Sequence, residues 1–378
     1  MIKDVSLRFL LDLLRPLFRS EPGPPTKQTS LSPVLPQRPI NDDRDAWRDY
    51  WRVRGQPWRT EPEISAERQK YLAERQSITP DIEQGIYPFK DIKLSRADVE
   101  WLLATHENGK GPIDWSDESQ KERQGLDMRG VDLSYVDLSR LPLSRMRGGL
   151  PEALRTNTTL EQRDAASVHL VKANLREAHL EMVVLGRAHL EGADLRGAFL
   201  ENAYLRVAHL EGADLSRAYL EGADLSRTHL ESAYLRGAHL EGAKLTEAHL
   251  EGASLRETYL GGKRIQVGSD KRSVVLKPAD MRGAYFDNAT NLEGTRLGDE
   301  KHGFISLADA RWDSINLAVV DWTQVNMLGD EYQARQLKKV SENERNKDEV
   351  LQLYQTAVRA NRQLYASKLI MRQVPVTE

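Results

Sequence analysis

The chain has 378 residues with 29% charged side chains, a formal net charge of −3 and no cysteine. This near-neutral balance excludes the strong field that nucleic-acid or membrane binding uses, and the lack of cysteine excludes disulfides, thiolate metal sites and cysteine nucleophiles. Because no apolar run approaches the roughly 20 residues that span a bilayer, we expect a cytoplasmic protein of roughly two to three domains.

Residues 1–20 predict an amphipathic helix, in which apolar side chains such as Val5, Phe9 and Leu13 lie opposite charged ones. The charges interrupt the segment too often for a secretory signal. Its net charge of +2 is weak for an anionic bilayer, so we expect it to dock on its own chain or in a partner's groove. Residues 21–40 are rich in proline and serine, which predicts an extended linker.

Residues 41–124 contain five of the seven tryptophans and several helix-start signals. The segment from Thr60 to Glu63 has the spacing of a capping box, and Ser95 stands before a run of helix-forming residues. We expect a small helical region here that packs on the first unit of the next domain.

The central part of the chain is a five-residue repeat. From Leu170 to Leu260 every fifth residue is leucine, nineteen in succession. The residue two before each leucine is alanine, with four exceptions: Val168, Val183, Thr228 and Thr258. This period fits neither an α-helix, where five residues turn the chain by about 500°, nor a continuous strand, where residues five apart face opposite sides. Short extended segments joined by corners remain, and they wind the chain into a coil of three or four sides.

The repeat resembles the pentapeptide-repeat family, whose unit is described as A-[D/N]-L-x-x. Ala173-Asn174-Leu175, Ala213-Asp214-Leu215 and Ala223-Asp224-Leu225 match this unit. The resemblance implies a right-handed quadrilateral β-helix with four pentapeptides per coil. Together with its flanks, the chain is also similar to a subset of bacterial pentapeptide-repeat proteins of undefined function.

The same five-residue step continues beyond the central leucines. It is followed upstream by Met128, Leu133, Leu138 and Leu143, and downstream by Met281, Phe286, Leu307, Trp312, Leu317, Trp322 and Met327. We therefore expect a mainly β fold, with a β-helix over residues 125–328 and α-helical flanks at both ends. Two insertions, 147–165 and 261–278, interrupt the β-helix.

Residues 329–378 predict C-terminal helices. Val350, Tyr354, Ala357, Asn361 and Leu364 mark one face of a helix of about five turns. This face offers a surface through which two copies of the chain could form a homodimer.

Seven of the nine histidines stand just before a repeat leucine, and six of them form His-Leu-Glu triplets. Five histidines are separated by multiples of twenty residues, so a twenty-residue coil would align them in an outward ladder about 4.8 Å apart. Imidazole and carboxylate groups in this pattern are candidate metal ligands, namely His189, Glu191, His209, Glu211, His229 and Glu231. We favour plain ring stacking, because a flat ladder lacks the closed shell of a metal site.

The insertion at 261–278 is basic. Its cationic residues are Lys263, Arg264, Lys271, Arg272 and Lys277. Because functional residues favour loops on rigid scaffolds, this insertion is the candidate contact for a partner. A surface insertion without a function is the alternative interpretation.

We expect no enzymatic activity and no cofactor, since the chain lacks the G-x-S-x-G, P-loop, G-x-G-x-x-G and H-E-x-x-H motifs. The expected function is an interaction scaffold for a protein partner. The alternative is a DNA mimic that binds a type II topoisomerase such as gyrase, as some members of the family do. Residues 168–262 contain fourteen acidic against ten basic side chains, a weak excess for a mimic. A third hypothesis is a metal-dependent activity on the histidine ladder.

Overall fold

The computed structural model describes residues 37–120, 122–267, 272–286, 289–299, 303–306, 310–312 and 325–327. The chain divides into two units, Met1–Gln37 and Arg38–Glu378, and nearly all described residues belong to the second. The helix expected at 1–20, most of the linker at 21–40 and the C-terminal helices at 329–378, with their homodimer contact, lie outside the described residues. Within the described part, no helix is both long and apolar enough to cross a membrane.

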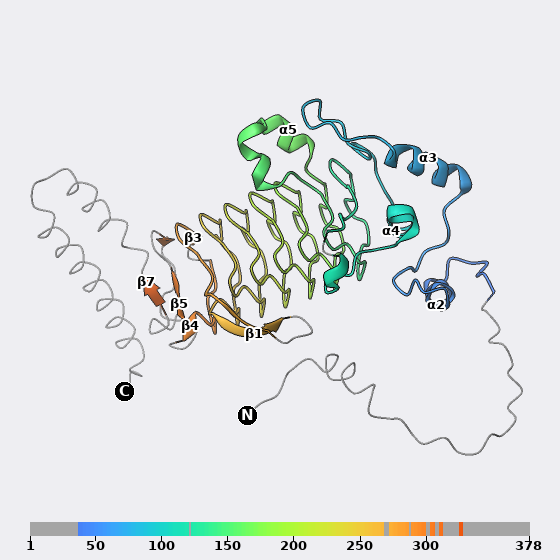
Figure 1. Ribbon diagram of the computed structural model, residues 1–378. Helices are drawn as coiled ribbons and strands as arrows, with labels where there is room; N and C mark the ends of the chain where they lie inside the picture. Colours follow the sequence, from blue (N-terminus) through green and yellow to red (C-terminus); the bar gives the residue numbers. More distant parts are fainter. Residues whose placement is uncertain are drawn as a thin grey trace, which may run out of the picture. The chain divides into compact units, whose positions relative to one another are not determined.

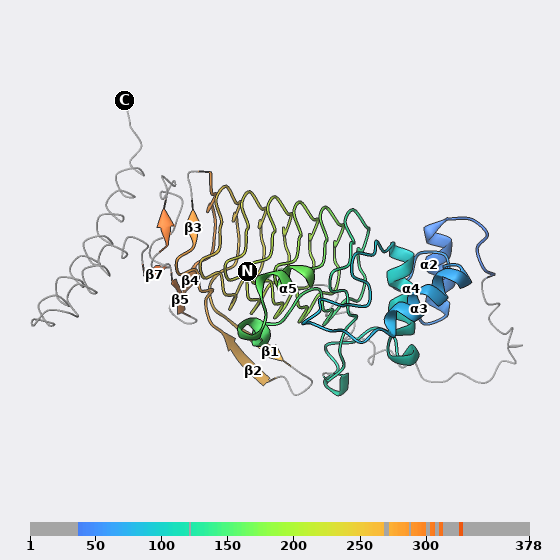
Figure 2. The same cartoon turned by 90° about the horizontal axis from the view of Figure 1, so that it is seen from above.

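The leucine repeat forms a β-helix whose coils stack along one axis (Figures 1 and 2). Residues twenty apart form parallel β-bridges, so each regular coil contains twenty residues. One coil makes four such bridges, which are His169↔His189, Asn174↔Asp194, His179↔Phe199 and Val184↔Tyr204. The coil therefore has four sides. This confirms the β-helix and decides between three and four sides, which the five-residue period left open.

Each corner of the coil is a hydrogen-bonded turn. In the first one, the backbone N–H of Ala173 donates to the carbonyl of Leu170 at 3.0 Å, and Lys172 at the third position has φ +52°. A positive φ at the third position is typical of a type II turn and favours glycine. Gly192 occupies the equivalent position one coil later, with φ +63°. The last residue of the pentapeptide varies in type, but its backbone must adopt a positive φ.

The core consists of the leucines and alanines of the repeat, which are all at most 1% exposed between Leu170 and Leu260. Two threonines replace alanines in this core, and both are fully buried. The hydroxyl of Thr228 donates to the carbonyl of Leu205 at 2.9 Å, and Thr258 makes the same bond to Leu235. A buried hydroxyl costs little stability when it is hydrogen-bonded, which explains how threonine fits the inward register.

Three helices precede the β-helix: α2 (Arg44–Val53), α3 (Ala66–Gln76) and α4 (Arg96–Gly109). Ser95 caps α4 in a capping box with Asp98, as predicted. The helix start predicted at Thr60 is wrong, because α3 begins at Ala66 after the cap Ser65. Thr60 instead donates from its N–H and its hydroxyl to the buried carboxylate of Glu100 on α4.

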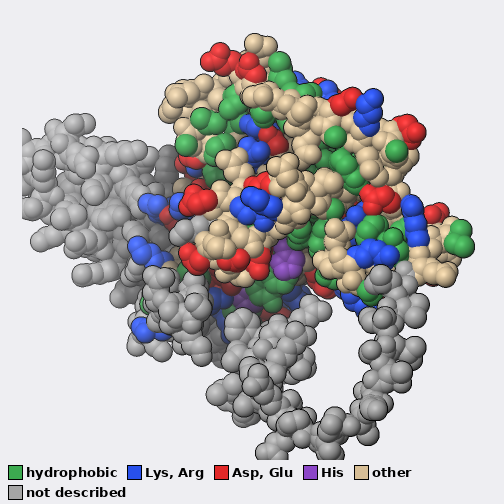
Figure 3. Space-filling model, turned by 45° about the vertical axis from the view of Figure 1, so that its right-hand side comes forward, with side chains coloured by type: hydrophobic (Ala, Val, Ile, Leu, Met, Phe, Trp, Pro, Cys, Tyr) green, Lys and Arg blue, Asp and Glu red, His purple; other side chains and the backbone are tan. Residues whose placement is uncertain are grey.

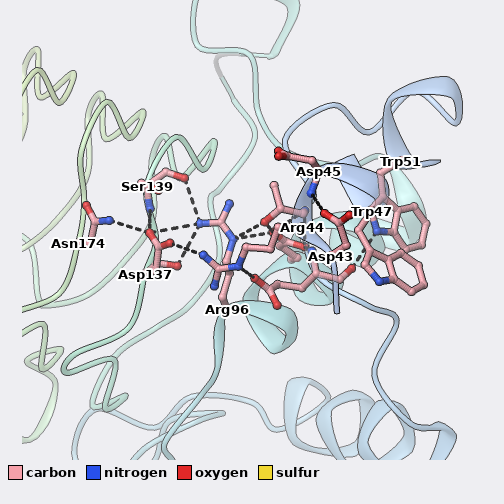
Figure 4. Close-up of polar contacts among 12 residues, drawn as sticks. Asp43, Arg44, Asp45, Trp47, Trp51, Arg96, Asp137, Ser139 and Asn174 are labelled. Carbon is pink, nitrogen blue, oxygen red and sulfur yellow. Dashed lines mark hydrogen bonds and ion pairs between the residues drawn. The ribbon is translucent and has the colours of Figure 1, made fainter. Parts of the chain in front are cut away.

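Arg96 forms a buried ion pair within α4 and links this helix to the first coil. The Arg96 guanidinium lies 2.8 Å from Oε1 of Glu100 and donates to the carbonyls of Asp137 and Ser139, each at 3.1 Å. Arg44 of α2 reaches the carboxylate of the same Asp137 at 2.9 Å (Figure 4). Both α2 and α4 thus contact Asp137. Because Asp137 lies on the outer side of a coil, this coil is the surface on which the helical region packs.

The first insertion adds seventeen residues, because bridge partners around it are 37 residues apart instead of 20, as in Asp132↔His169. It forms the short helices η2 (Glu152–Asn157) and α5 (Leu160–Ala165). A further short helix, η1 (Glu118–Gln120), lies just before the first coil. The predicted bounds of 147–165 start too early, because Arg147 still bridges Val184 inside the β-helix.

The second insertion adds sixteen residues, since Lys244 bridges Asp280 at a separation of 36 instead of 20. It forms an antiparallel hairpin of β1 (Lys263–Val267) and β2 (Arg272–Leu276), which lies beside the last coils in both ribbon views (Figures 1 and 2). The predicted loop is therefore a β-hairpin.

The register slips by one residue after β3 (Tyr285–Phe286), because the next bridge, Ser254↔Asn291, spans 37 residues instead of 36. Leu292 and Leu297 then point inward, and the five-residue step from Phe286 does not predict them. Four short strands follow: β4 (Gly298–Asp299), β5 (Gly303–Ser306), β6 (Arg311–Trp312) and β7 (Val325–Met327). β6 pairs with β3 and β7 with β5, both in parallel. The predicted inward residues Leu307, Leu317 and Trp322 lie outside the described residues.

Candidate functional site: the polar columns of the β-helix

The twenty-residue coil stacks equivalent side chains into columns along the rod. The His–Glu face carries one column of rings and one of carboxylates. Its residues are His169, His189, His209, His229, His249, Glu191, Glu211, Glu231 and Glu251. The aromatic–Glu face lies two sides further along the coil. Its residues are His179, Phe199, Tyr219, His239, Tyr259, Glu181, Glu201, Glu221 and Glu241.

The histidines of the His–Glu face stack on one another, as predicted. Ring centroids are 4.7 Å apart for His169 and His189, and between 4.8 and 5.2 Å for the following pairs, with planes within 15° of parallel. Tyr285 extends the stack at 4.4 Å from His249. Because each ring is held between two others, its orientation is fixed by the backbone spacing of the coils.

Four of these histidines, from His189 onward, also contact the glutamate two residues further along their own coil. The distance from Nδ1 to the carboxylate Oε1 is 3.0 Å for His189, 3.1 Å for His209 and His229, and 3.4 Å for His249. A carboxylate can only accept, so Nδ1 carries the proton in these bonds. The second nitrogen, Nε2, is then the one left without the proton.

Each ring from His209 onward also lies near the glutamate of the preceding coil. This arrangement gives three sets of donor atoms within 4.8 Å of one another: Glu191/His209/Glu211, Glu211/His229/Glu231 and Glu231/His249/Glu251. The structure thus brings together five of the six predicted metal-ligand candidates in the first two sets, while His189 has only one glutamate. Val171 occupies the preceding-coil position at His189, so this ring has no second carboxylate.

The aromatic–Glu face is a second stack that the sequence does not predict as such. His179, Phe199, Tyr219 and His239 follow one another with ring centroids 4.7 to 5.2 Å apart. The ten-residue rhythm of the glutamates is the signal that could have revealed it, since ten residues alternate between two opposite sides of a four-sided coil.

Glu201 on this face has an unusual environment. Phe199 stands where other coils place a histidine, so no imidazole donates to its carboxylate. Burial raises the pKa of the Glu201 carboxyl to about 7, and the neighbouring carboxylates of Glu221 and Glu181 add to the shift. By contrast, Glu181 accepts hydrogen bonds from Ser144 at 2.6 Å and from His179 at 2.9 Å. Glu201 is therefore a carboxyl that holds a proton near neutral pH.

Further along the same column, a cation from the hairpin binds two glutamates. The ammonium of Lys263 lies 2.8 Å from Oε1 of Glu221 and 3.1 Å from Oε1 of Glu241. Burial opposes the charged ammonium, but these two carboxylates outweigh it and raise the pKa of Lys263. With His239, the two glutamates form a fourth donor set of the same composition as those on the His–Glu face.

The structure distributes the other predicted contact residues of the insertion differently. Arg264 and Lys277 are exposed, so they remain available for a partner. Lys271 lies outside the described residues, and nothing is described of the Arg272 side chain.

The side between the two glutamate faces carries arginines, which we call the arginine face. Its column is Arg176, Arg196, Ser216, Arg236 and Arg256, at twenty-residue spacing. The arginines pair with acidic groups nearby: Arg196 with Asp194 at 2.5 Å, Arg236 with Glu257 at 3.1 Å and Arg256 with Glu293 at 3.1 Å. One positive column therefore lies between the two glutamate columns.

A hollow of about 240 Å³ lies beneath the first insertion. Arginines line it, including Arg187, Arg206 and Arg227. Each of them has an acidic neighbour: Asp164 lies 2.5 Å from Arg187, Glu152 3.5 Å from Arg206 and Glu247 2.6 Å from Arg227. The pairs of Asp164 and Glu152 tie the insertion to the coils, so the hollow is a structural joint.

The model of the pentapeptide-repeat family matches residues 184–222 and 223–262, with eight copies of the repeat. No match to a curated protein sequence was found.

Among solved structures, the chain is similar to HetL, a pentapeptide repeat protein involved in heterocyst differentiation regulation from the cyanobacterium Nostoc. The identity is 22% and the TM-score 0.33, over 57% of this chain and 79% of HetL. It is also similar to QnrB1, a plasmid-mediated fluoroquinolone resistance protein, with 17% identity and a TM-score of 0.30 over 55% of this chain and 84% of QnrB1. The pentapeptide repeat protein Rfr23 from the cyanobacterium Cyanothece has 25% identity and a TM-score of 0.16, over 48% of this chain and 88% of Rfr23.

Proposed function

The chain is a pentapeptide-repeat protein, and from this premise we propose that it is a non-enzymatic scaffold whose β-helix presents ordered polar faces to a protein partner. The observation that carries the proposal is the fixed geometry of the outer columns. Stacked rings, paired arginines and hydrogen-bonded corners hold these side chains at the spacing of the coils. A partner that binds such a surface orders few side chains, which lowers the entropic cost of association.

The contacts of the histidines argue for a structural role of these rings rather than a catalytic one. In the part of the chain that the structure describes, the ring-nitrogen contacts of the repeat histidines are to glutamates. A hydrolytic or transfer site needs a hydroxyl or thiol nucleophile within hydrogen-bond reach of such a base. The chain has no cysteine to supply the thiol.

The insertions extend the surface that a partner can contact. Arg264 and Lys277 of the hairpin are exposed beside the acidic aromatic–Glu face. They form a basic edge that could bind the carboxylates of a partner, and we propose this edge as the contact site.

A DNA-mimicking binder of a type II topoisomerase such as gyrase is the second candidate. The two glutamate columns on opposite sides of the rod favour it, because a mimic needs regularly spaced negative charge. The arginine face and the bound ammonium of Lys263 weigh against it. Acidic and basic side chains are also interspersed on the face of the molecule shown in Figure 3.

Variants of single faces test the scaffold proposal with the full chain. Serine already stands at position 216 of the arginine column, so Arg176→Ser, Arg196→Ser and Arg236→Ser together remove three of its four arginines with a residue that the coil accepts. The matched set is Glu211→Gln, Glu231→Gln and Glu251→Gln on the His–Glu face. We expect a partner captured by crosslinking to be lost with one set and kept with the other, at equal melting temperature.

An unchanged set of bound proteins for both variants would contradict the proposal. The topoisomerase alternative is tested separately by adding the purified chain to a gyrase supercoiling assay. Inhibition or protection that disappears with the glutamine set, but not with the serine set, would favour the mimic over the general scaffold.

A further inference from the structure

We propose that the His–Glu face binds divalent transition-metal ions of the zinc class at two separate sites, Glu191/His209/Glu211 and Glu231/His249/Glu251. In each site the ligands are one imidazole Nδ1 and one oxygen from each of two carboxylates. Solvent would fill the remaining position. This function goes beyond the scaffold proposal and does not depend on it.

The distances between the donor atoms fit a small tetrahedral ion. Zinc binds nitrogen and oxygen at about 2.0–2.2 Å, which places neighbouring ligands of a tetrahedron roughly 3.4 Å apart. His249 Nδ1 lies 3.4 Å from Oε1 of Glu251 and 3.9 Å from Oε1 of Glu231. His209 Nδ1 lies 3.1 Å from Oε1 of Glu211, and Glu191 completes its set within 4.8 Å. The distances from His249 to its two carboxylates need shifts of only a few tenths of an ångström, and the His209 set closes from separations of at most 4.8 Å.

On the opposite face of the rod, an equivalent set of one histidine and two glutamates binds a cation. There, Glu221, His239 and Glu241 form the equivalent donor set, and the Lys263 ammonium is bound to both carboxylates. Glu241 is only 5% exposed at its side chain, so this cation is held in a largely enclosed position. On the His–Glu face, no lysine or arginine among the described residues pairs with the corresponding glutamates. These sets therefore lack the cation that the same geometry binds elsewhere in the molecule.

The side chains of the His–Glu face also provide the enclosure that a flat ladder would lack. Their glutamates are only about a third exposed, at 33 to 36%. The second oxygen, Oε2, of each is buried without a hydrogen-bond partner in the described part of the chain. Buried carboxylate oxygens without donors favour a cation. The stacking of the rings fixes the direction of Nδ1, as second-shell contacts do in established metal sites.

The number of sites follows from shared ligands. The middle set, Glu211/His229/Glu231, takes one glutamate from each of its neighbours. Occupying the two outer sets leaves it without free carboxylates, whereas an ion in the middle set would block both. We therefore expect two ions per chain.

Binding requires a rearrangement of protons on the ring. Nδ1 now carries the proton that it donates to the carboxylate, so on binding this proton moves to Nε2 by exchange with solvent. A neutral ring thus keeps one proton and releases none. A protonated ring must release one proton, so acid opposes binding.

Isothermal titration of the full chain with ZnCl₂ at pH 7.5, with protein purified without a histidine tag, tests the proposal. We expect two ions for the wild type and two for His229→Gln, which removes only the middle set. His209→Gln with His249→Gln should bind one ion, in the freed middle set. The triple variant, in which His209, His229 and His249 are all changed to Gln, should bind none. His169→Gln is the matched control, because its ring stacks in the same column but is followed by Val171 instead of a glutamate.

Melting curves establish that each variant folds before it is titrated. Zinc should raise the melting temperature of the wild type and His169→Gln, but not that of the triple variant. Three results would overturn the proposal: no zinc binding by the folded wild type, loss of a site with His169→Gln, or equal stoichiometry for the wild type and the triple variant. Loss of a site with the control would show binding that follows the number of surface histidines, and equal stoichiometry would show binding that does not use these rings.

Discussion

Lys263 and Glu221 form an ion pair across 42 residues, with 2.8 Å between Nζ and Oε1. The hairpin that carries Lys263 is thereby tied to an earlier coil of the β-helix. Glu241 takes part in the same contact, so one ammonium binds two neighbouring glutamates of the aromatic–Glu column. The hairpin therefore contributes to the stability of the rod as well as to its surface.

Deleting residues 263–278 should leave the β-helix folded. The deletion joins Gly262 to Ala279 and places Leu260 and Met281 five positions apart, which restores the pentapeptide step. It also removes the ammonium from two poorly exposed carboxylates, so we expect a loss of about 1–3 kcal/mol in the free energy of unfolding. Thermal melts followed by circular dichroism measure both effects.

Lys263→Met is the control for this deletion, because it removes the charge and keeps the hairpin. Equal destabilisation in the two variants would show that the hairpin stabilises the rod through Lys263 alone. A deletion variant that does not fold, next to a folded Lys263→Met, would show that the hairpin closes the core. A partner that is lost only with the deletion would place its contact on the rest of the hairpin.

Leu215→Asp should unfold the centre of the rod. Leu215 is fully buried, so the substitution places an unpaired carboxylate in an apolar core at a cost of about 3–5 kcal/mol. Its neighbour Asp214 points outward and accepts a hydrogen bond from the N–H of Ser216 at 2.9 Å. Asp214→Asn keeps this acceptor and should change the melting temperature little. Equal melting temperatures for Leu215→Asp and wild type would contradict the inward register.

Glu201→Gln should stabilise the protein above neutral pH. The pKa of Glu201 is raised to about 7 by burial, so the folded state binds a proton more tightly than the unfolded state. The free energy of unfolding therefore falls as pH rises from about 4.5 to 7, and the substitution removes this loss. We expect a gain of up to about 3 kcal/mol at pH 8 and little gain at pH 5.

Urea unfolding at pH 5 and pH 8 measures this difference. Glu211→Gln is the control, because its carboxylate accepts a hydrogen bond from His209. The same pH dependence in wild type and Glu201→Gln would show that Glu201 does not hold a proton near pH 7.

Val207→Gly should stabilise the rod slightly. Val207 lies at a corner with φ +59°, a conformation that costs a β-branched residue about 1–2 kcal/mol. Other corners of the same kind use glycine, such as Gly212 with φ +66°. We expect a gain of about 1 kcal/mol after the entropic cost of glycine. Val184→Gly, at an extended bridge position, should instead lower the melting temperature, and a loss in both variants would contradict the explanation.

Arg96→Met should loosen the helical region from the first coil. It leaves the carboxylate of Glu100, which is fully buried, without its cation, at a cost of about 3–5 kcal/mol. Arg44→Met is the matched control, since Arg44 contacts the same Asp137 from a half-exposed position and should contribute at most about 1 kcal/mol. Hydrogen exchange in α4 compares the two, and equal protection would show that the buried pair does not hold the helix.

The sequence by itself determined the β-helix and most of its core. A leucine at every fifth position leaves a coil as the only regular backbone that buries all of them, so Leu170 to Leu260 could be placed before any coordinates. The ladder of histidines followed from the same period once the coil was taken to hold twenty residues. The cap at Ser95 was readable because capping depends on neighbours in sequence.

Only the tertiary structure decided how distant groups meet. The contacts of Lys263 with Glu221 and of Arg96 with Asp137 join segments more than forty residues apart, and no local pattern encodes them. The register shifts by one residue after Phe286, so the five-residue step does not predict that Leu292 and Leu297 are buried. Whether a carboxylate is neutralised, bonded by a histidine or left to hold a proton, as at Glu201, depends on which side chains the neighbouring coils place beside it. These surroundings depend on packing and burial. The repeat fixes the spacing of the side chains but not their charge.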